Sequence, residues 1–535
     1  MSAQTEGIAP NASRLLWAGF MAILAAGVGF AIRGGIFDNW GKEFGFTGAQ
    51  LGSIGAAGLS GFCFGIIIGG VVCDKIGYGK LVITALVLHI VSAFVTFAAV
   101  PGDGGETARA TAYNFLFGGM FIFAFANGTL EAVANPLVAT LYPKNRTHYL
   151  NLLHASWPAG MIVGTALGWV LDDKMGVGWK TQLALYLIPT AIYGLMFFGQ
   201  KYPRSEAAEK GASLGEMFKD VGVLGALIVG FLLSLFFADF LKLFGVSPDT
   251  AKVIGYVIGG VAVLAVGLLT KFSIGSVLLF VLFVTHALIG SVELGTDQWI
   301  QFITGNIFTS SEQGKILFLW TSAIMFGLRF CGHWIENTLK ISPVMLLFIC
   351  SVLAFAGLQM ASGMQTFTMA LVALGIYAVG KTFFWPTMLA VASDRFPRTG
   401  AVAISIMGGI GMLSVGTIGG PGLGYLKDKF ASEELHAKNP ALYEQVKASQ
   451  PSKLLNLDST KVFGFDGKKL AEAKEAKEAG TPEQKQIVAA DQAGDRKTLK
   501  FDSYIPFTMA IIYLLLLLYF KGIGGYKPIH IDEQK

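Results

Sequence analysis

The chain has 535 residues, of which 53% are hydrophobic and only 14% are charged. Soluble domains carry about 25% charged residues, so this composition excludes an ordinary soluble protein and indicates a chain solvated mostly by lipid. The formal net charge of +5 is small and spread over predicted turns, which gives no case for a nucleic-acid partner.

Apolar runs long enough to cross a bilayer recur along the chain. About 20 helical residues are needed to span a hydrocarbon core of about 30 Å. Six runs lie in the first part of the chain, near residues 15–38, 48–73, 79–101, 111–142, 149–171 and 180–200. Six more lie near 275–303, 316–338, 342–361, 366–393, 400–424 and 503–520, and two lie between these sets, at 223–241 and 253–270. The sequence predicts an all-α polytopic membrane protein of about fourteen helices, with two six-helix bundles and an inserted two-helix hairpin.

The runs predict the domain boundaries. We expect an N-terminal tail at 1–13, the first bundle at 14–202, a linker and hairpin at 203–272, the second bundle at 273–426 and 503–521, a polar loop at 427–502, and a C-terminal tail at 522–535. Basic residues favour the turns on the side of the N-terminus, which places both tails in the cytoplasm and the polar loop outside. The loop is rich in Lys, Glu, Ala and Gln, which favours a solvated tether over a cap on the outer mouth.

A glycine, an acid four residues later and a following base recur after the second apolar run of each half. The first copy comprises Gly70, Asp74, Lys75, Gly77 and Lys80, and the second comprises Gly332, Glu336 and Lys340. In a helix, the glycine allows close approach of a neighbouring helix, and the acid lies one turn further on the same face. The spacing between the copies becomes ordinary for a six-helix half only if residues 219–272 are an insertion.

This pattern resembles the signature G-x-x-x-D-[RK]-x-G-[RK] of the major facilitator superfamily, which joins the second and third helices of each half. The resemblance implies a secondary transporter whose acids form a cytoplasmic gate. We expect a monomer in the bilayer, in a bacterial inner membrane, with a small-molecule solute as its partner and no cofactor other than a coupling H⁺ or Na⁺.

A polar stripe marks the run at 111–142. Asn127, Glu131 and Asn135 recur at i, i+4 and i+8 and therefore share one helix face. Ionisable groups inside a bilayer are costly and mark solute or ion pathways. Glu131 at mid-depth is a candidate to load and release a proton, or it is neutralised and serves packing only. On the next helix, His154 is either a proton relay or a hydrogen-bonded core histidine.

Two segments resemble the fucose-permease branch of the superfamily. Glu131-Ala-Val-Ala-Asn135-Pro136 followed by Leu150-Asn151-Leu-Leu-His154 is similar to its E-x-x-x-N-P and L-N-x-x-[HQ] elements. Glu293-Leu-Gly-Thr-Asp297-Gln-Trp299 is similar to an E-x-G-T-D-x-W element of sugar-transporting relatives. The resemblance implies that Glu131 takes part in proton coupling and sugar binding. That branch has an acid on its first helix, where this chain has Arg33.

Further polar residues within apolar runs are candidates for solute or ion binding. Arg33 either reaches toward Glu131 or an anionic substrate, or snorkels to the outer interface. The other candidates are Glu293, Asp297 and Gln301 on the first run of the second half, Arg329 on the next, and Lys381 with Trp385 near 366–393. Glu293 and Asp297 either contribute to the binding site or lie at the outer mouth of the pathway.

The sequence therefore predicts a secondary active transporter that moves a small polar solute, a sugar or related metabolite, by alternating access with a coupled proton or sodium ion. Two alternatives stay open: an exporter or antiporter of amphipathic or anionic compounds, and a receptor or scaffold with a transporter-like shell. The sequence contains no phosphate-cradling loop, zinc spacing or nucleophile elbow, so it does not indicate an enzyme.

Overall fold

The computed structural model describes residues 9–44, 48–102, 105–204, 211–332, 334–448, 451–452, 454, 462–476 and 479–530. Across these residues the regular secondary structure is helical, with two isolated β-bridges joining Lys447 to Phe465 and Ser452 to Val462. The predicted all-α class is confirmed.

The first bundle and the hairpin occupy the first half of the chain. The bundle contains α1 (Ala12–Gly35), α2 (Phe37–Phe44), α3 (Gly48–Ile76), α4 (Tyr78–Phe97), α5 (Glu106–Leu141), α6 (Arg146–His154), α7 (Ser156–Gly168), the π-helix η2 (Trp169–Lys174), α8 (Trp179–Ala184) and α9 (Leu187–Phe197). The hairpin region contains α11 (Leu214–Phe218), α12 (Gly222–Phe240), the 3-10 helix η3 (Leu241–Phe244) and α13 (Pro248–Leu269).

The second bundle and a small helical domain complete the chain. Their elements are α14 (Val277–Gly290), η4 (Ser291–Gly295), α15 (Thr296–Ile307), α16 (Ser311–Arg329), η5 (Trp334–Thr338), α17 (Pro343–Ser362), α18 (Phe367–Lys381), α19 (Phe384–Arg395), η6 (Pro397–Thr399), α20 (Ala401–Ser414), η7 (Val415–Gly419), α21 (Gly420–Lys438), α22 (Pro440–Val446), α23 (Gly467–Glu475), α24 (Pro482–Asp502) and α25 (Tyr504–Gly522).

Eleven helical stretches among the described residues are long and apolar enough to cross a membrane. Three other predicted spans are helical but interrupted: α6 with α7 and η2, α8 with α9, and α16 with η5. Pro158 and Pro189 lie in the first turns of α7 and α9, where a residue without an N–H is tolerated, so the helices restart there. The count of fourteen helices stays a prediction.

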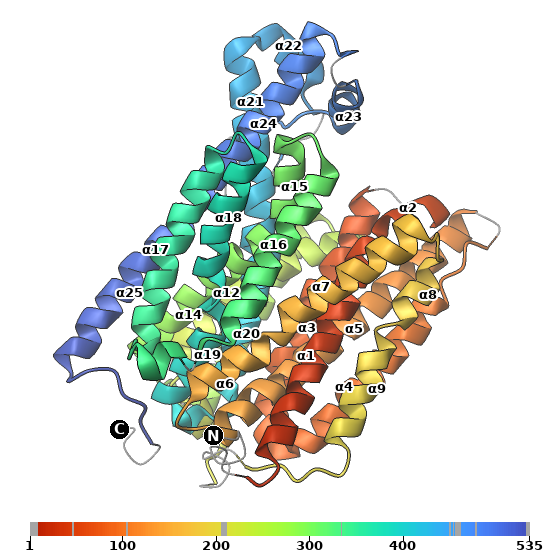
Figure 1. Ribbon diagram of the computed structural model, residues 1–535. Coiled ribbons are helices and arrows are strands. Elements are labelled where there is room, and N and C mark those ends of the chain that lie inside the picture. The colour runs from red at the N-terminus through yellow and green to blue at the C-terminus, as the bar shows by residue number, and fades with distance from the viewer. Residues whose placement is uncertain are drawn as a thin grey trace.

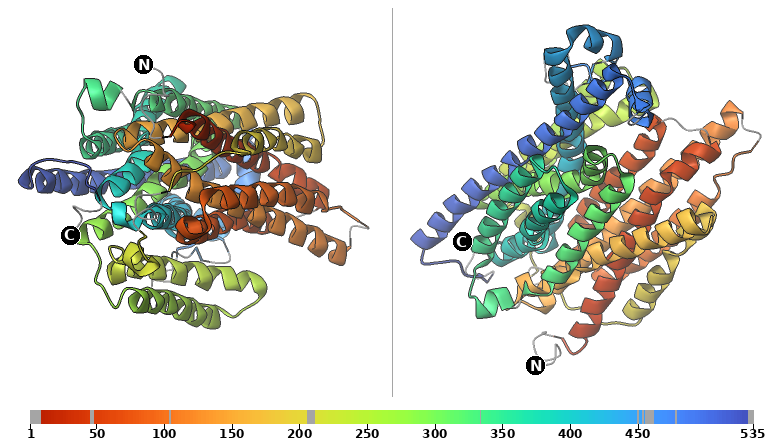
Figure 2. Two further views of the ribbon diagram at one scale, coloured as in Figure 1. Left: turned by 90° about the horizontal axis from the view of Figure 1, so that it is seen from below. Right: turned by 45° about the horizontal axis from the view of Figure 1, so that its top comes forward.

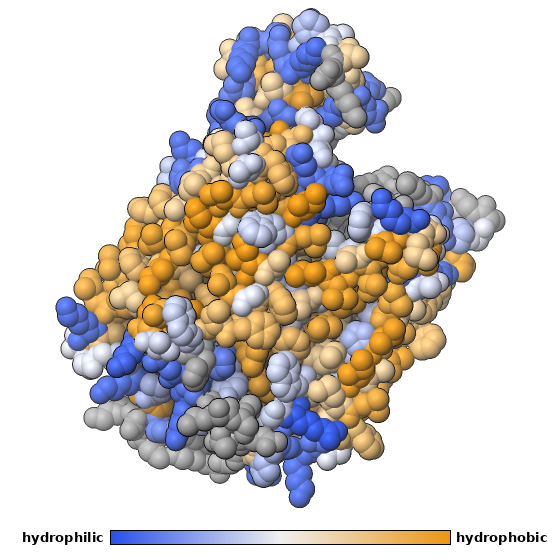
Figure 3. Space-filling view, in the orientation of Figure 1, coloured by the Kyte–Doolittle hydropathy of each residue, from blue (hydrophilic) through white to orange (hydrophobic). Residues whose placement is uncertain are grey.

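The two bundles lie side by side, the first in red to yellow and the second in green to blue (Figure 1). The described ends of the chain lie together at one end of the molecule, called here the termini end. The helical domain formed by α22, α23 and the adjoining parts of α21 and α24 protrudes at the opposite end, called here the domain end. A broad hydrophobic band covers the bundles between more hydrophilic ends (Figure 3), as expected of an integral membrane protein.

Glycines set the close crossing of α3 and α5. A Cβ added at Gly65 would lie 2.1 Å from the carbonyl oxygen of Phe125, and one added at Gly128 would lie 2.1 Å from that of Phe62. Any side chain at these positions would push the two backbones apart. This explains part of the chain's high glycine content, because small residues let helices pack backbone to backbone in a bilayer.

The inserted hairpin packs along one side of the molecule, where it is seen at the bottom of the left view in Figure 2. Its α12 meets the first bundle through Phe64, whose ring lies 5.9 Å from that of Phe236, and the second through Gly225, which faces Phe283 of α14. Asp239 and Lys242 form a local ion pair within the hairpin, at 2.7 Å. The hairpin therefore touches both bundles and bridges them from outside.

The tether interpretation of residues 427–502 is wrong for the described part of that segment. Helices α21 and α24 extend past the bundle and enclose an apolar core with Leu435, Leu442 and Ile487. Lys427 bridges Asp491 and Asp495 at 2.8 and 2.7 Å. The charges that suggested a solvated surface include a buried network, which joins this domain to α15 through hydrogen bonds from Asn306 to both aspartates.

Candidate functional site

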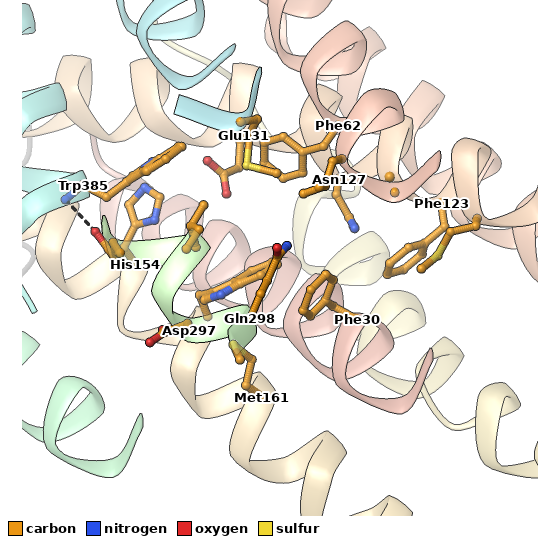
Figure 4. Close-up of a pocket in the computed structure, with 18 of the residues that line it drawn as sticks. Phe30, Phe62, Phe123, Asn127, Glu131, His154, Met161, Asp297, Gln298 and Trp385 are labelled. Atoms are coloured by element: carbon orange, nitrogen blue, oxygen red, sulfur yellow. Dashed lines mark hydrogen bonds between the residues drawn. The ribbon is translucent and has the colours of Figure 1, made fainter. Parts of the chain in front are cut away.

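A cavity of about 120 Å³ lies between the two bundles, at the level of the polar stripe on α5. The first bundle lines it with residues of α1, α3, α5, α6 and α7, and the second with residues of η4, α15, α16, α19 and α20. Seven sequence candidates line the cavity: Asn127, Glu131, His154, Glu293, Asp297, Arg329 and Trp385. The labelled side chains surround a common space in Figure 4. The structure thus brings together polar residues from runs far apart in sequence.

Glu131 is held by amide groups and not by a cation. Its Oε2 accepts a hydrogen bond from Asn135 Nδ2 at 3.3 Å, and Asn135 Oδ1 lies 2.8 Å from His154 Nε2. Asn135 therefore sits behind the cavity wall and links Glu131 to His154. Among the described residues Glu131 forms no ion pair, and its carboxylate faces the cavity (Figure 4).

Arg329 is neutralised within the second bundle and also touches the first. Its Nη2 donates to Glu293 Oε1 at 3.1 Å and its Nε donates to the Thr382 carbonyl at 3.0 Å. Its Nη1 donates to the carbonyl of His154. The other oxygen of Glu293 accepts from the backbone N–H of Trp385 at 3.3 Å, the dashed line in Figure 4. An arginine with this fixed fork of donors holds the bundles together across the cavity floor.

Lys381 and Asp297 form the second buried pair. The Lys381 ammonium donates to Asp297 Oδ1 and is fully buried. Asp297 lines the cavity but Lys381 lies behind it. Gln301 lies outside the central cavity, in a larger cavity of about 1100 Å³ that shares Asp297 with the first and extends to Asn39 and Lys315 near the domain end.

Arg33 does not reach Glu131 or the cavity. The side chain is fully buried, which also contradicts a snorkelling position. Its guanidinium carbon lies 3.7 Å from the ring centre of Phe123 and 4.7 Å from that of Tyr186. Arg33 is therefore held by aromatic faces within the first bundle, and Phe123 separates it from the cavity.

The π-helix η4 explains why Gln298 was missed. An i, i+4 stripe from Glu293 selects Asp297 and Gln301, but η4 inserts a wider turn at Ser291–Gly295. The wider turn rotates the following residues, so Asp297 and Gln298 face the central cavity and Gln301 does not. The apolar residues of the lining were also missed, because an apolar run has the same pattern whether its side chains line a cavity or pack in a core. They include Phe30, Phe62, Phe123, Trp157 and Met161.

The first signature motif closes the termini end against the second bundle. Asp74 Oδ2 accepts from the N–H of Ala401, at 3.2 Å, so the acid caps the positive N-terminal end of α20. A Cβ on Gly70 would lie 2.0 Å from that of Ser405, which explains the glycine. Gly77 turns the chain into α4 with a φ of 93°, and Lys75 and Lys80 are exposed beside it.

The second copy of the motif makes the reciprocal contact. Gly332 lies against α6, because a Cβ there would be 3.3 Å from His148 Cα, and Glu336 lies beside Thr147 and His148. Lys340 is exposed in the following turn. Each acid thus faces the start of a helix in the opposite bundle. A further ion pair between Arg146 of α6 and Asp394 of α19, at 3.0 Å, joins the bundles at this end and was not foreseen.

The sequence and the fold resemble those of known proteins. The family model described as Major Facilitator Superfamily matches residues 19–296, more than half of the chain. The chain belongs to the major facilitator superfamily. Members of this superfamily are transporters, and the resemblance seen in the signature motifs is confirmed.

Two curated proteins match shorter segments of the chain. The cis,cis-muconate transport protein of Acinetobacter baylyi is 29% identical over 181 residues, 34% of this chain and 40% of that protein. The L-fucose-proton symporter of Escherichia coli is 31% identical over 128 residues, 24% of this chain and 27% of that protein. The chain therefore matches less than half the length of each relative.

Solved structures of the superfamily share the fold over nearly the whole chain. A proton:xylose symporter gives a TM-score of 0.58 at 14% identity, covering 95% of each chain. The transporter FucP in the outward conformation gives 0.52 at 16% identity, covering 90% of this chain and 98% of that one. The human organic anion transporter MFSD10 gives 0.54 at 14% identity, with 94% and 100% covered. At these identities the likeness concerns the fold alone.

Proposed function

We propose that this transporter is a proton-coupled symporter of a small neutral polar solute, with the solute in the central cavity and the proton on Glu131. The observation that carries the proposal is the pairing of charges around the cavity. Arg329 and Lys381 each have a carboxylate partner, Glu293 and Asp297, whereas Glu131 has an amide partner.

A carboxylate without a cation inside a bilayer is stabilised by taking up a proton. Glu131 is therefore the group whose charge can change at least cost to the remaining pairs. A solute that hydrogen-bonds to Glu131 gains most when the carboxyl is protonated, since the site then carries no unpaired charge. Solute and proton thus favour each other, which is the coupling that symport requires.

Neutral solutes fit this charge balance better than anions. An anion would have to draw Arg329 or Lys381 away from a buried carboxylate, which is costly because the abandoned carboxylate would remain unpaired. Aromatic rings on the wall, among them Phe30, Phe62 and Trp385, suit the apolar faces of a sugar. The relative named as an L-fucose-proton symporter agrees with this choice.

Transport of an anion is the second candidate. It is favoured by the relative named as a cis,cis-muconate transport protein and by Arg329, a buried cation that lines the cavity. We further propose that the termini end is cytoplasmic. The closed contacts at that end and the larger cavity that reaches toward the domain end support this proposal. With the termini end in the cytoplasm, the transporter is in an outward-facing state.

The test is uptake by proteoliposomes containing the purified protein. L-fucose, D-xylose and cis,cis-muconate are offered under an inward proton gradient, an inward sodium gradient, or neither. We expect a sugar to accumulate with the proton gradient, and a protonophore to abolish the accumulation. Glu131→Gln should lose accumulation but keep exchange of sugar for sugar, whereas Glu312→Gln, an exposed acid at the start of α16, should behave like the parent.

The outcomes separate the alternatives. Accumulation of muconate without sugars would support the anion candidate, and dependence on sodium alone would overturn the proton assignment. Binding without uptake of any solute would favour a receptor. Full accumulation by Glu131→Gln would show that the proton resides elsewhere.

A further inference from the structure

His89 of α4 is a buried polar residue outside the cavity wall, and the proposed transport reaction does not use it. Its side chain is fully buried, yet both ring nitrogens have partners. Nε2 lies 2.7 Å from Asn127 Oδ1, and Nδ1 lies 2.9 Å from the hydroxyl of Tyr193. Its backbone carbonyl accepts from the hydroxyls of Tyr186, at 2.6 Å, and Ser92, at 2.7 Å. The ring is therefore held in place from several sides.

The contact with Asn127 decides where the imidazole carries its hydrogen. A side-chain amide oxygen only accepts hydrogen bonds, so Nε2 of His89 must be the donor. Nδ1 of the neutral ring then accepts from Tyr193. A protonated imidazole would place its positive charge beside that of Arg33 inside the bilayer, which is costly. The neutral ring with its hydrogen on Nε2 therefore fits this environment.

The same contact orients the amide of Asn127. Because Oδ1 is turned toward His89, the NH₂ group is turned toward the cavity, as the labelled side chain shows in Figure 4. Without a donor at His89, the amide could rotate and present its oxygen instead. The amide lies on the same face of α5 as Glu131, about 6 Å away along the helix axis at about 1.5 Å per residue.

We propose that His89 is a positioning residue that makes Asn127 a hydrogen-bond donor to the solute, and thereby selects solutes with an acceptor oxygen at that place. This inference rests on the proposed function insofar as the central cavity holds the solute. For a sugar, the acceptor is one ring hydroxyl oxygen; for an anion, it is a carboxylate oxygen.

The test measures binding to purified protein by D-xylose, L-fucose, and their monodeoxy and monofluoro analogues. Fluorine can accept a hydrogen bond weakly but cannot donate one, so a fluoro sugar keeps the acceptor that a deoxy sugar lacks. For the parent we expect one ring position where deoxygenation weakens binding about tenfold, roughly 1.4 kcal/mol, and fluorination does so much less.

The variants separate positioning from packing. His89→Leu removes the donor and should reduce the deoxy-to-fluoro difference at that position to less than about threefold, within the range of a weak neutral hydrogen bond. His89→Gln keeps an N–H that can reach Asn127 and should restore the difference. Tyr186→Phe removes the hydroxyl that donates to the His89 carbonyl and leaves the aromatic ring beside the imidazole. It is the matched control for disturbance of the cluster, and it should keep the difference.

Retention of the full difference by a folded His89→Leu protein would overturn the inference, as would loss of the difference in His89→Gln. If the parent binds muconate and no sugar, the proposed neutral solute is wrong but the inference is still tested. Muconate carboxylates accept hydrogen bonds, so His89→Leu should then weaken muconate binding about tenfold and His89→Gln should not.

Discussion

The ion pair between Arg146 and Asp394 should govern how often the termini end opens. The two side chains come from opposite bundles and are 11% and 6% exposed. Asp394 also accepts from the hydroxyl of Tyr526 at 2.8 Å, and Arg146 also donates to the carbonyls of Ala139 and Ser393. When the bundles separate at this end, both charges become hydrated, so the pair stabilises the closed arrangement specifically.

The magnitude follows from what Asp394→Asn removes. The amide keeps one oxygen for Arg146 but loses the charge, and Arg146 keeps its two backbone acceptors. We therefore expect the closed arrangement to lose about 1.5–3 kcal/mol of stability relative to the open one, the usual contribution of a hydrogen bond to a charged group. This is less than the ~3–5 kcal/mol that breaking a buried ion pair completely costs. At about 1.4 kcal/mol per factor of ten, the equilibrium should shift toward opening by roughly 10- to 150-fold.

The assay is a distance measurement between spin labels at Lys144 and Lys340, which are exposed on different bundles at the termini end. Asp394→Asn should enlarge the population with the longer distance. Asp239→Asn, which breaks an exposed pair in the hairpin, should leave the distribution unchanged. If both variants give the parent's distribution, the Arg146–Asp394 pair does not hold the gate, and the reasoning is refuted.

Three further predictions concern the gate, the packing and the hairpin. Tyr526→Phe should raise the ratio of open to closed populations, measured with the same spin labels, about fivefold, because it removes one hydrogen bond worth about 1 kcal/mol. An unchanged ratio would mean that the C-terminal tail does not hold the gate. Gly65→Val should lower the melting temperature, because its added atoms clash with α5 at a cost of about 1–3 kcal/mol; Gly168→Val, with no atom within 4 Å of the added Cβ, is the control. Excision of residues 219–272 with a flexible linker of about 15 residues should preserve uptake, since the hairpin lines neither cavity; binding without transport would contradict this.

Local periodicity predicted the site only where the helix is regular. Asn127 and Glu131 share a face of the long regular helix α5, so their common position in the cavity wall followed from spacing alone. The same argument selected Gln301 over Gln298, because a π-turn cannot be recognised from apolar pattern. Sequence gives the depth of Arg33 along its helix but not its rotation toward Phe123.

Contacts between distant segments lay beyond the sequence. Nothing in the residues around Arg146 names Asp394 as its partner, since the pairing depends on how two bundles dock. Likewise, the composition of 427–502 is that of a solvated surface, although Lys427, Asp491 and Asp495 neutralise one another in a buried cluster. Charge composition does not distinguish hydrated charges from paired ones.

The protruding domain gives this transporter a built-in marker of its own motion. Helix α21 continues into it without a break, and α24 is separated from α25 by a single residue. Among the described residues, the polar contacts of this domain with the membrane part, such as Thr296 with Asp502 and Gln359 with Ser503, all reach the second bundle. The domain should therefore tilt as one body with that bundle, so an antibody fragment or a fluorophore attached to it would amplify small rocking angles into displacements visible by electron microscopy or energy transfer.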